Sequence, residues 1–281
     1  MSLLVSTHLF RTQRLGAAQL DLLQSAGAAG VELFCARTSF DYHDRTQAME
    51  LASWFHANPL PLHSLHSPIY ADEREGRSGE PPIDVADAEP RHRLAALDEV
   101  QRVLEFSERV SFRYLIQHLG PPRADWDERR ADRALTSLER LRLLAKQAGV
   151  TVLVENIPNG LSQPQRLLPF LEASHLDDVG ICFDAGHAHM AEHLFGGGGV
   201  GTSWERLAAR VRSTHLHDNH GSLDEHLWPG DGTIDWKELM LKLPASLPRV
   251  LEVGDLPGNQ KMDLRARLRA CADKLADFAH E

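Results

Sequence analysis

The segment STHLHDNHGSLDEHLWPGDGTIDW, residues 213–236, determines how the whole chain is interpreted. It begins with the polarity alternation of a β-strand, and His215 and His217 lie two residues apart, so both point to one face of that strand. The loop beyond adds imidazole and carboxylate groups, which are ligand types of transition-metal sites. These are His220, His226, Asp218, Asp224 and Asp231. A histidine-rich surface loop is the alternative, but it has no reason to space its histidines with strand periodicity, so we predict a metal site here.

The composition is that of an ordinary globular protein. The chain has 281 residues, 42% hydrophobic and 25% charged, which is enough for one large α/β domain. The formal net charge of −10 argues against binding nucleic acid through its phosphates, so we expect no nucleic-acid partner. The sixteen histidines are many for this length, and histidine is the commonest metal ligand.

The cysteines and the first residues bear on the cellular compartment. Cys35, Cys182 and Cys271 are scattered and form no CxxC motif, so they predict no disulfide framework and fit a reducing, cytoplasmic setting. The apolar run near the N-terminus is short and is interrupted by His8 and Arg11. It therefore predicts neither a signal peptide nor a membrane span.

Short apolar runs that alternate with helical patterns indicate the fold. Most of the runs predicted as strands are continuously apolar, as parallel strands buried on both faces are. They are residues 3–9, 31–35, 61–67, 113–118, 150–155, 179–184, 213–217 and 249–253. The predicted helices are residues 17–29, 45–58, 88–110, 125–149, 163–173, 204–211, 235–243 and 259–280. This alternation predicts a (β/α)8 TIM barrel, as a single domain over residues 1–281.

Several helix ends and loops can also be predicted. Gly30 is expected to end the first helix, Asp125 to cap the fourth and Ser162 to cap the fifth. Residues 68–90 and 188–203 are predicted as long loops, the second with a flexible insert of four glycines. We expect substrate specificity to lie in these two loops.

Acids and histidines recur where the predicted strands end. They are His66, His118, Glu155, Asp184, His215 and Glu252. TIM barrels build their active sites at the carboxyl ends of the strands, so these side chains are expected to converge. Converging carboxylates need a cation, and mixed oxygen and nitrogen ligands suit zinc, manganese, iron or cobalt better than calcium. We predict one or more divalent metal ions per chain.

Motifs along the chain resemble one superfamily. They are ENI at 155–157, FDAGH at 183–187, HLHD at 215–218, DEHLWPGDGTIDW at 224–236 and LEV at 251–253. In this order they resemble the xylose isomerase-like TIM barrel superfamily, over essentially the whole chain. That superfamily includes sugar and sugar phosphate isomerases and epimerases, inosose dehydratase and the apurinic-site endonucleases of family 2.

The epimerase branch implies a single metal ion. The resemblance places its ligands at Glu155, Asp184, His215 and Glu252. It implies that Glu155 and Glu252 act as base and acid from opposite faces of the substrate, and that His187 binds a substrate oxygen. The chain departs from the ketose 3-epimerases at Gly221, where those enzymes carry an arginine.

The endonuclease branch implies three zinc ions and therefore further ligands. These would be His66, His118, His187, Asp224 and His226. Such a cluster clamps a phosphodiester and generates hydroxide. The acidic net charge and the lack of a basic, aromatic-bearing loop argue against cleavage of DNA. His66 and His118 have an alternative interpretation as rim histidines that only form hydrogen bonds.

Other residues are candidates for contact with the substrate. His217 is expected nearer the mouth than His215, as a substrate contact or an extra ligand, and Trp228 is the tryptophan expected beside a sugar. Weaker candidates are His8, Glu32 and His189, expected at the rim or behind the ligands.

The predicted function is that of a cytoplasmic, divalent-metal-dependent isomerase or epimerase of a small sugar, sugar phosphate or polyol. The rival is a multinuclear-metal phosphodiesterase, which would bind two or three ions per chain instead of one. A third alternative is a metal-bearing barrel that binds a carbohydrate without converting it, although the two glutamates argue against it. No particular oligomeric state is predicted.

Overall fold

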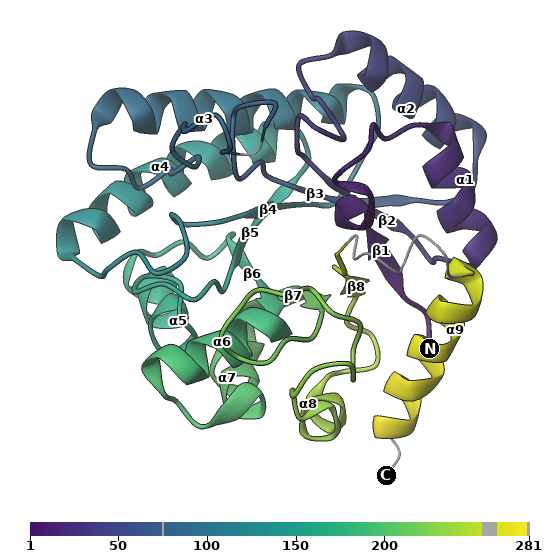
Figure 1. Ribbon diagram of the computed structural model, residues 1–281. Coiled ribbons are helices and arrows are strands. Elements are labelled where there is room, and N and C mark those ends of the chain that lie inside the picture. The colour runs from purple at the N-terminus through teal and green to yellow at the C-terminus, as the bar shows by residue number, and fades with distance from the viewer. Residues whose placement is uncertain (75, 255–262, 280–281) are drawn as a thin grey trace.

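Parallel strands close into a barrel in the order of the chain, β1 to β8 (Figure 1). This computed structural model describes residues 1–74, 76–254 and 263–279. The strands are β1 (Leu4–Ser6), β2 (Val31–Phe34), β3 (Leu62–His66), β4 (Tyr114–Gln117), β5 (Thr151–Glu155), β6 (Gly180–Asp184), β7 (Val211–Leu216) and β8 (Arg249–Leu251). The predicted (β/α)8 TIM barrel is confirmed.

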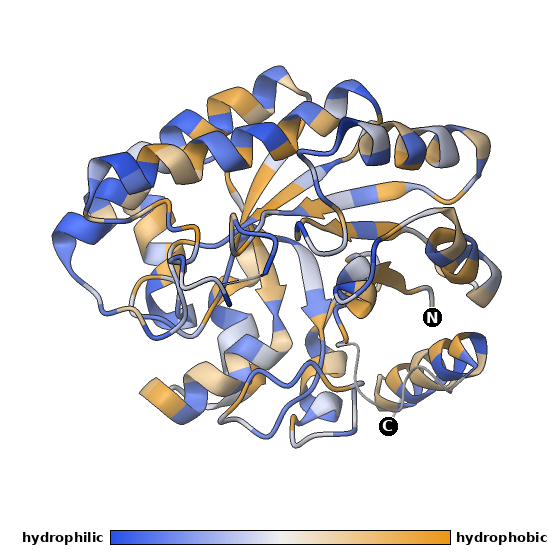
Figure 2. Ribbon diagram, turned by 45° about the horizontal axis from the view of Figure 1, so that its top comes forward, coloured by the Kyte–Doolittle hydropathy of each residue, from blue (hydrophilic) through white to orange (hydrophobic). Residues whose placement is uncertain are grey.

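Helices surround the barrel (Figure 1). They are α1 (Ala17–Ala26), α2 (Arg45–Ala57), α3 (Pro90–Leu104), α4 (Glu128–Gln147), α5 (Pro164–Ala173), α6 (Ala185–Phe195), α7 (Gly199–Leu207), α8 (Trp236–Lys242) and α9 (Leu264–Phe278), with 3-10 turns η1 (Thr7–Phe10), η2 (Glu105–Glu108) and η3 (Ala208–Arg210). The strands are mainly hydrophobic, whereas the helices alternate hydrophobic and hydrophilic residues (Figure 2). No helix in the described ranges is both long enough and apolar enough to cross a membrane.

The strand register brings candidate site residues to one level. Asp184 lies opposite His215 on the neighbouring strand, after an irregularity of register between Ile181 and Cys182. Glu155, the last residue of β5, lies opposite Cys182. Because parallel strands of a barrel all end at the same rim, residues at or next to the ends of β5 to β8 surround a common point.

Among the predicted helix boundaries that differ from the structure, two are wrong for local reasons. α1 ends at Gly27 rather than at Gly30, because Gly27 takes the left-handed conformation (φ 92°) that closes a helix. α4 is capped by Asp127 rather than by Asp125, because the Asp127 carboxylate accepts a hydrogen bond from the backbone N–H of Arg130.

The first strand and the cap of α5 also differ from the prediction. β1 ends at Ser6, whose hydroxyl accepts a hydrogen bond from the backbone N–H of His8 and starts η1. Residues 7–9 are therefore not part of the strand. Gln163, rather than Ser162, precedes α5, which begins with a proline.

Residues 188–203 are largely helical, contrary to the predicted loop. Asp184 ends β6, and its carboxylate accepts a hydrogen bond from the backbone N–H of His187, so α6 begins with no intervening loop. Glycines 196–198 have positive φ angles and make the turn into α7, which begins at Gly199. The predicted flexible insert is a tight connection between two helices.

The loop between β7 and α8 is held by one buried carboxylate. Asp218 forms an antiparallel bridge with Leu227, which closes the loop that carries Asp224 and His226. Its carboxylate accepts four hydrogen bonds. The donors are the backbone N–H groups of Asn219, Gly230 and Ile234 and the indole N–H of Trp236. Asp218 therefore serves as the anchor of this loop.

Replacing Asp218 by alanine should leave these buried donors unsatisfied and lower the free energy of unfolding by about 3 kcal/mol. Urea denaturation measures this change. The control is Asp125→Ala, which removes an exposed carboxylate that caps no helix and should change stability by no more than about 0.5 kcal/mol. Equal stabilities of the two variants would contradict the anchoring role.

Candidate metal centre

Acids and a histidine from β5, β6 and β7 and from the residue after β8 form a buried group at the carboxyl end of the barrel. They are Glu155, Asp184, His215 and Glu252. One ligand atom of each lies within 4.8 Å of all the others. Nδ1 of His215 is 3.4 Å from Oε1 of Glu155 and 3.2 Å from Oε2 of Glu252. These residues are at most 2% exposed, so water does little to screen their charges.

Histidines from β3 and from the end of β4 form a second group around Glu155. Nε2 of His66 lies 3.2 Å, and Nε2 of His118 lies 3.1 Å, from Oε2 of Glu155. The other oxygen, Oε1, lies 2.9 Å from Nδ1 of His187. His66 and His118, for which a role as rim histidines was the alternative, therefore both reach the buried carboxylate. Glu155 is contacted on both of its oxygens.

Helix α6 and the loop after β7 supply the remaining groups. Nε2 of His217 lies 3.1 Å from Asp184, and the His217 ring stacks on that of His226 with centroids 4.1 Å apart. Oδ2 of Asp224 is 3.2 Å from Nε2 of both His187 and His226. Two further potential ligand groups result. They are Asp184, His187 and His217, and His217, Asp224 and His226.

Neighbouring groups share residues. Glu155 belongs to the first and second groups, Asp184 to the first and third, and His217 to the third and fourth. A carboxylate between two cation positions lowers the repulsion between the cations. All the ligands predicted from the sequence thus lie in one connected cluster, which His217 joins as well.

Acceptors behind the histidines set the orientation of their rings. Nε2 of His215 faces Glu32 at 3.1 Å, and Ser64 donates to the same carboxylate at 2.7 Å. Nδ1 of His226 donates to the backbone carbonyl of Glu252 at 2.7 Å. Metal-bound histidines commonly donate their second N–H to such acceptors, which fixes the tautomer. Glu32, a weak candidate in the sequence, therefore lies directly behind a candidate ligand.

Three residues that were not singled out in the sequence shape the floor of the site. Asn156 donates to the carbonyl of Asp184 and accepts from its N–H, both at 2.9 Å. A Cβ atom on Gly186 would lie 2.0 Å from the His217 ring, so glycine leaves the room that this histidine needs. Asn219 donates to the carbonyl of Gly186 at 2.9 Å. The two asparagines each directly follow a motif acid, which is the signal that could have identified them.

Burial and mutual contact shift the pKa values of these groups in opposite directions. Burial raises the pKa of Glu155, but the positive charge of the surrounding histidines outweighs it and holds the pKa well below its usual value. Burial lowers the pKa of His187, but Asp184 and Asp224 raise it well above the usual value. In the metal-free protein the His187 imidazole therefore carries a proton, which a bound cation would displace.

The donor set fits a divalent cation. Oε1 of Glu155 and the Nδ1 atoms of His187 and His215 are buried and form no hydrogen bond, although each nitrogen lies within 3.4 Å of that oxygen. Polar atoms that face one another in this way, without hydrogen-bond geometry, have the arrangement of ligands around a common ion. Mixed imidazole and carboxylate donors suit zinc, manganese, iron or cobalt.

The remaining predicted contacts lie outside these groups. Trp228 is buried in the hydrophobic core, with the guanidinium of Arg267 5.2 Å above its ring, and its role in sugar binding stays a prediction. Nε2 of His189 lies 3.0 Å from the Thr233 hydroxyl. His8 is buried, and burial together with the charge of His226 lowers its pKa well below the usual value.

The sequence model of the protein family described as "Xylose isomerase-like TIM barrel" matches residues 20–271. The chain belongs to this family. The predicted superfamily is thereby confirmed. The fold is also similar to that of a D-tagatose 3-epimerase-like protein, with a TM-score of 0.76 and 19% identity over 100% of this chain and 98% of that one.

Two further proteins resemble this member of the family. The TTHB071 protein from Thermus thermophilus, in crystals soaked with zinc chloride, has a TM-score of 0.71 and 23% identity over 99% of this chain and 98% of that one. The uncharacterized protein MJ1614 of Methanocaldococcus jannaschii is 25% identical over 159 residues, 55% of this chain and 59% of that one. The chain thus spans less than two thirds of the curated relatives that it matches.

The pKa shifts predict how the stability of the metal-free protein depends on pH. The pKa of His226 is raised from 6.5 to about 9 because Asp224 outweighs the effect of burial. Its contribution to stability is therefore complete below pH 6.5 and is lost as the pH rises through about 9. The lowered pKa of Asp224 acts only on acidification. We expect the melting temperature of metal-free protein to fall between pH 6.5 and about 9.

Differential scanning calorimetry of chelator-treated protein measures this dependence. His226→Gln should weaken it, whereas His56→Gln, at an exposed position of α2, should leave it unchanged. Protein loaded with zinc should not lose stability over this range, because a bound ion holds the imidazoles without their protons. A constant melting temperature of the metal-free wild type would contradict the charge pairing.

Proposed function

We propose that the chain is a divalent-metal-dependent isomerase or epimerase that moves a proton next to a carbonyl of a small sugar, sugar phosphate or polyol. The observation that carries this proposal is the buried group of Glu155, Asp184, His215 and Glu252 at the end of the barrel. Membership of the family and likeness to a D-tagatose 3-epimerase-like protein support the same class of reaction. A cation bound by this group would polarise the substrate oxygens.

The two glutamates are the proposed proton-transfer groups. Glu155 ends β5 and Glu252 follows β8, so the ligands from β6 and β7 lie between them. One carboxylate would take a proton from the carbon next to the carbonyl. The other would pass a proton, taken up from a neighbouring imidazole or from solvent, to the opposite face of that carbon, which inverts it.

The contacts of the two glutamates differ, and this difference assigns their roles. Both oxygens of Glu155 face imidazole nitrogens, at distances between 2.9 and 3.4 Å. Among the described residues, the Glu252 carboxylate has one ion-pair contact, with His215 at 3.2 Å. Because Glu252 has the less occupied carboxylate, we assign the abstraction of the proton from carbon to it.

Replacing Glu252 by glutamine should slow exchange of the carbon-bound hydrogen with solvent by about 100- to 10,000-fold, the contribution of a general base. Proton NMR of ketoses and polyols in D2O measures this exchange, and circular dichroism checks the fold. The matched control is Glu225→Gln, in the loop after β7, whose carboxylate bonds to His220 instead of to the cluster. Undiminished exchange in Glu252→Gln would refute the assignment.

A second candidate function is that of a multinuclear-metal phosphodiesterase. The observation that favours it is the sharing of Glu155 and Asp184 between neighbouring ligand groups, which suits several adjacent cations. Such cations clamp the oxygens of a phosphodiester and activate water. The similarity in fold to a protein soaked with zinc chloride is consistent with this alternative.

Metal content per chain distinguishes the two candidates. About one equivalent, measured by elemental analysis on protein without a histidine tag, favours the isomerase, whereas two or three favour the phosphodiesterase. If the position around His66 and His118 is filled, His118→Ala should remove about one equivalent. His56→Ala, an exposed histidine of α2, should remove none. An unchanged content in His118→Ala would exclude that position as a metal site.

A further inference from the structure

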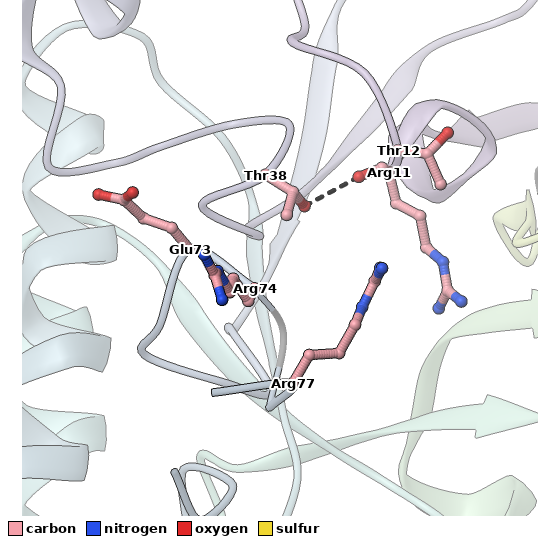
Figure 3. Close-up of a pocket in the computed structure, with 6 residues that line it drawn as sticks. All are labelled: Arg11, Thr12, Thr38, Glu73, Arg74 and Arg77. Atoms are coloured by element: carbon pink, nitrogen blue, oxygen red, sulfur yellow. Dashed lines mark hydrogen bonds between the residues drawn. The ribbon is translucent and has the colours of Figure 1, made fainter. Parts of the chain in front are cut away.

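A groove with an arginine lining opens at the mouth of the barrel. Its volume is about 540 Å³, and it is lined by Arg11, Thr12, Thr38, Glu73, Arg74 and Arg77 (Figure 3). The lining residues follow β1, β2 and β3, so the groove lies at the same end of the barrel as the candidate metal centre. Its volume is in the range of sites that bind small molecules.

The groove is positively charged, although the protein as a whole is acidic. Glu73, the acid of the lining, pairs with Arg37 at 3.0 Å. In Figure 3 the guanidinium groups of Arg11 and Arg77 point into the same space, whereas the Glu73 carboxylate points away from it. Among the ion pairs within residues 1–74, 76–254 and 263–279, none joins Arg11, Arg74 or Arg77 to a carboxylate, and the Glu73 carboxylate pairs with Arg37 instead. The three guanidinium charges are thus uncompensated by the described residues.

Other acids of the segment after β3 are engaged elsewhere. The Asp72 carboxylate is buried and accepts hydrogen bonds from the backbone N–H groups of Arg74 and Gly76. Asp84 is also buried and pairs with Arg130 at 2.7 Å. These acids therefore stabilise the loop, while its arginines face the groove.

His8 connects the groove to the candidate metal centre. Nη1 of Arg11 lies 3.3 Å from Nε2 of His8, and Nδ1 of His8 lies 3.3 Å from the carbonyl of Val253. Because a carbonyl only accepts, Nδ1 carries the proton and Nε2 accepts the hydrogen bond from the guanidinium. The His8 ring lies 4.3 Å from that of His226. One imidazole thus separates Arg11 from a candidate metal ligand and orients its guanidinium.

An apolar wall lies between the arginines and the histidine cluster. Phe34, Ile69 and Tyr70 line a smaller cavity that shares Arg11 with the groove. The ring of Phe34 lies 4.8 Å from that of His66, a candidate metal ligand. In a substrate that spans the cluster and the groove, the middle carbon atoms would therefore contact apolar side chains. The far end of the substrate would contact the arginines.

We propose that this groove binds the phosphate of a phosphorylated sugar whose carbonyl end lies at the metal centre. The planar guanidinium forms paired hydrogen bonds with phosphate oxygens, and three such groups offset the two charges of a phosphate monoester. The buried carboxylates of the cluster would repel that dianion, so it belongs at the positive end of the site. This inference rests on the proposed isomerase function and narrows its substrate class.

Inorganic phosphate is the probe, titrated by calorimetry into tag-free protein that retains its metal. We expect the double variant Arg74→Gln/Arg77→Gln to bind phosphate at least about tenfold more weakly than the wild type, because charge-assisted hydrogen bonds are lost. The control is Arg102→Gln, an exposed arginine near the end of α3, which leads back to the opposite rim of the barrel. Its affinity should equal that of the wild type.

Two further measurements distinguish phosphate binding by the arginines from binding by the metal centre and from binding of carboxylates in general. Asp184→Asn weakens the metal centre but leaves the arginines in place, so phosphate binding should persist in it. Binding that disappears in Asp184→Asn and survives in the double arginine variant would mean capture by metal, and would overturn the proposal. Acetate that competes as well as phosphate would also overturn it, in favour of a carboxylate site.

Hydrogen exchange on unphosphorylated ketoses separates this inference from the proposed function. If the wild type catalyses no exchange yet binds phosphate through its arginines, the isomerase proposal fails and the groove remains an anion site. Wild-type protein that exchanges ketose hydrogens but binds no phosphate would refute phosphate binding by the groove and leave the isomerase proposal intact.

Discussion

Negative charge buried at the carboxyl end of the barrel is the constraint on which the rest of the structure depends. Glu32, Glu155, Asp184 and Glu252 are each at most 2% exposed, and ionised carboxylates in such surroundings are strongly destabilising without a positive partner. Histidines from β3, β7, α6 and the loop after β7 supply that partner. The strand register, the glycine beneath His217 and the anchored loop all serve to bring imidazoles against acids.

The fold and the convergence of the candidate ligands could be predicted because both depend on local periodicity. Parallel strands buried on both faces are continuous apolar runs, so their ends can be located to within a few residues. Glu155 and Asp184 are the last residues of such runs, and strand ends in a barrel meet at one rim. The sharing of Glu155 by two ligand groups was not predictable, since it depends on distances between side chains at the ends of six strands, β3 to β8.

Features that depend on side-chain contacts, rather than on the composition of a segment, could not be predicted. Glycines 196–199 have the composition of a flexible loop, but the cap at Asp184 begins a helix before them and α7 begins at the last of them. Residues 68–90 are rich in acids, and yet arginines line the groove beside them, because Glu73 and Asp84 pair with Arg37 and Arg130 from other elements. Charge counted along a segment does not reveal which charges face outward.

Asp184 makes local folding and ion binding depend on one side chain. Oδ1 accepts the N–H of His187 at the start of α6, while Oδ2 lies 3.7 Å from Nδ1 of His215 in the cluster. An ion bound in the cluster therefore stabilises the first turn of α6 against local unfolding. Conversely, unfolding of that turn weakens the binding of the ion. The first turn of α6 and the metal centre therefore form one cooperative unit, because fraying of the helix also frees Asp184, a candidate metal ligand.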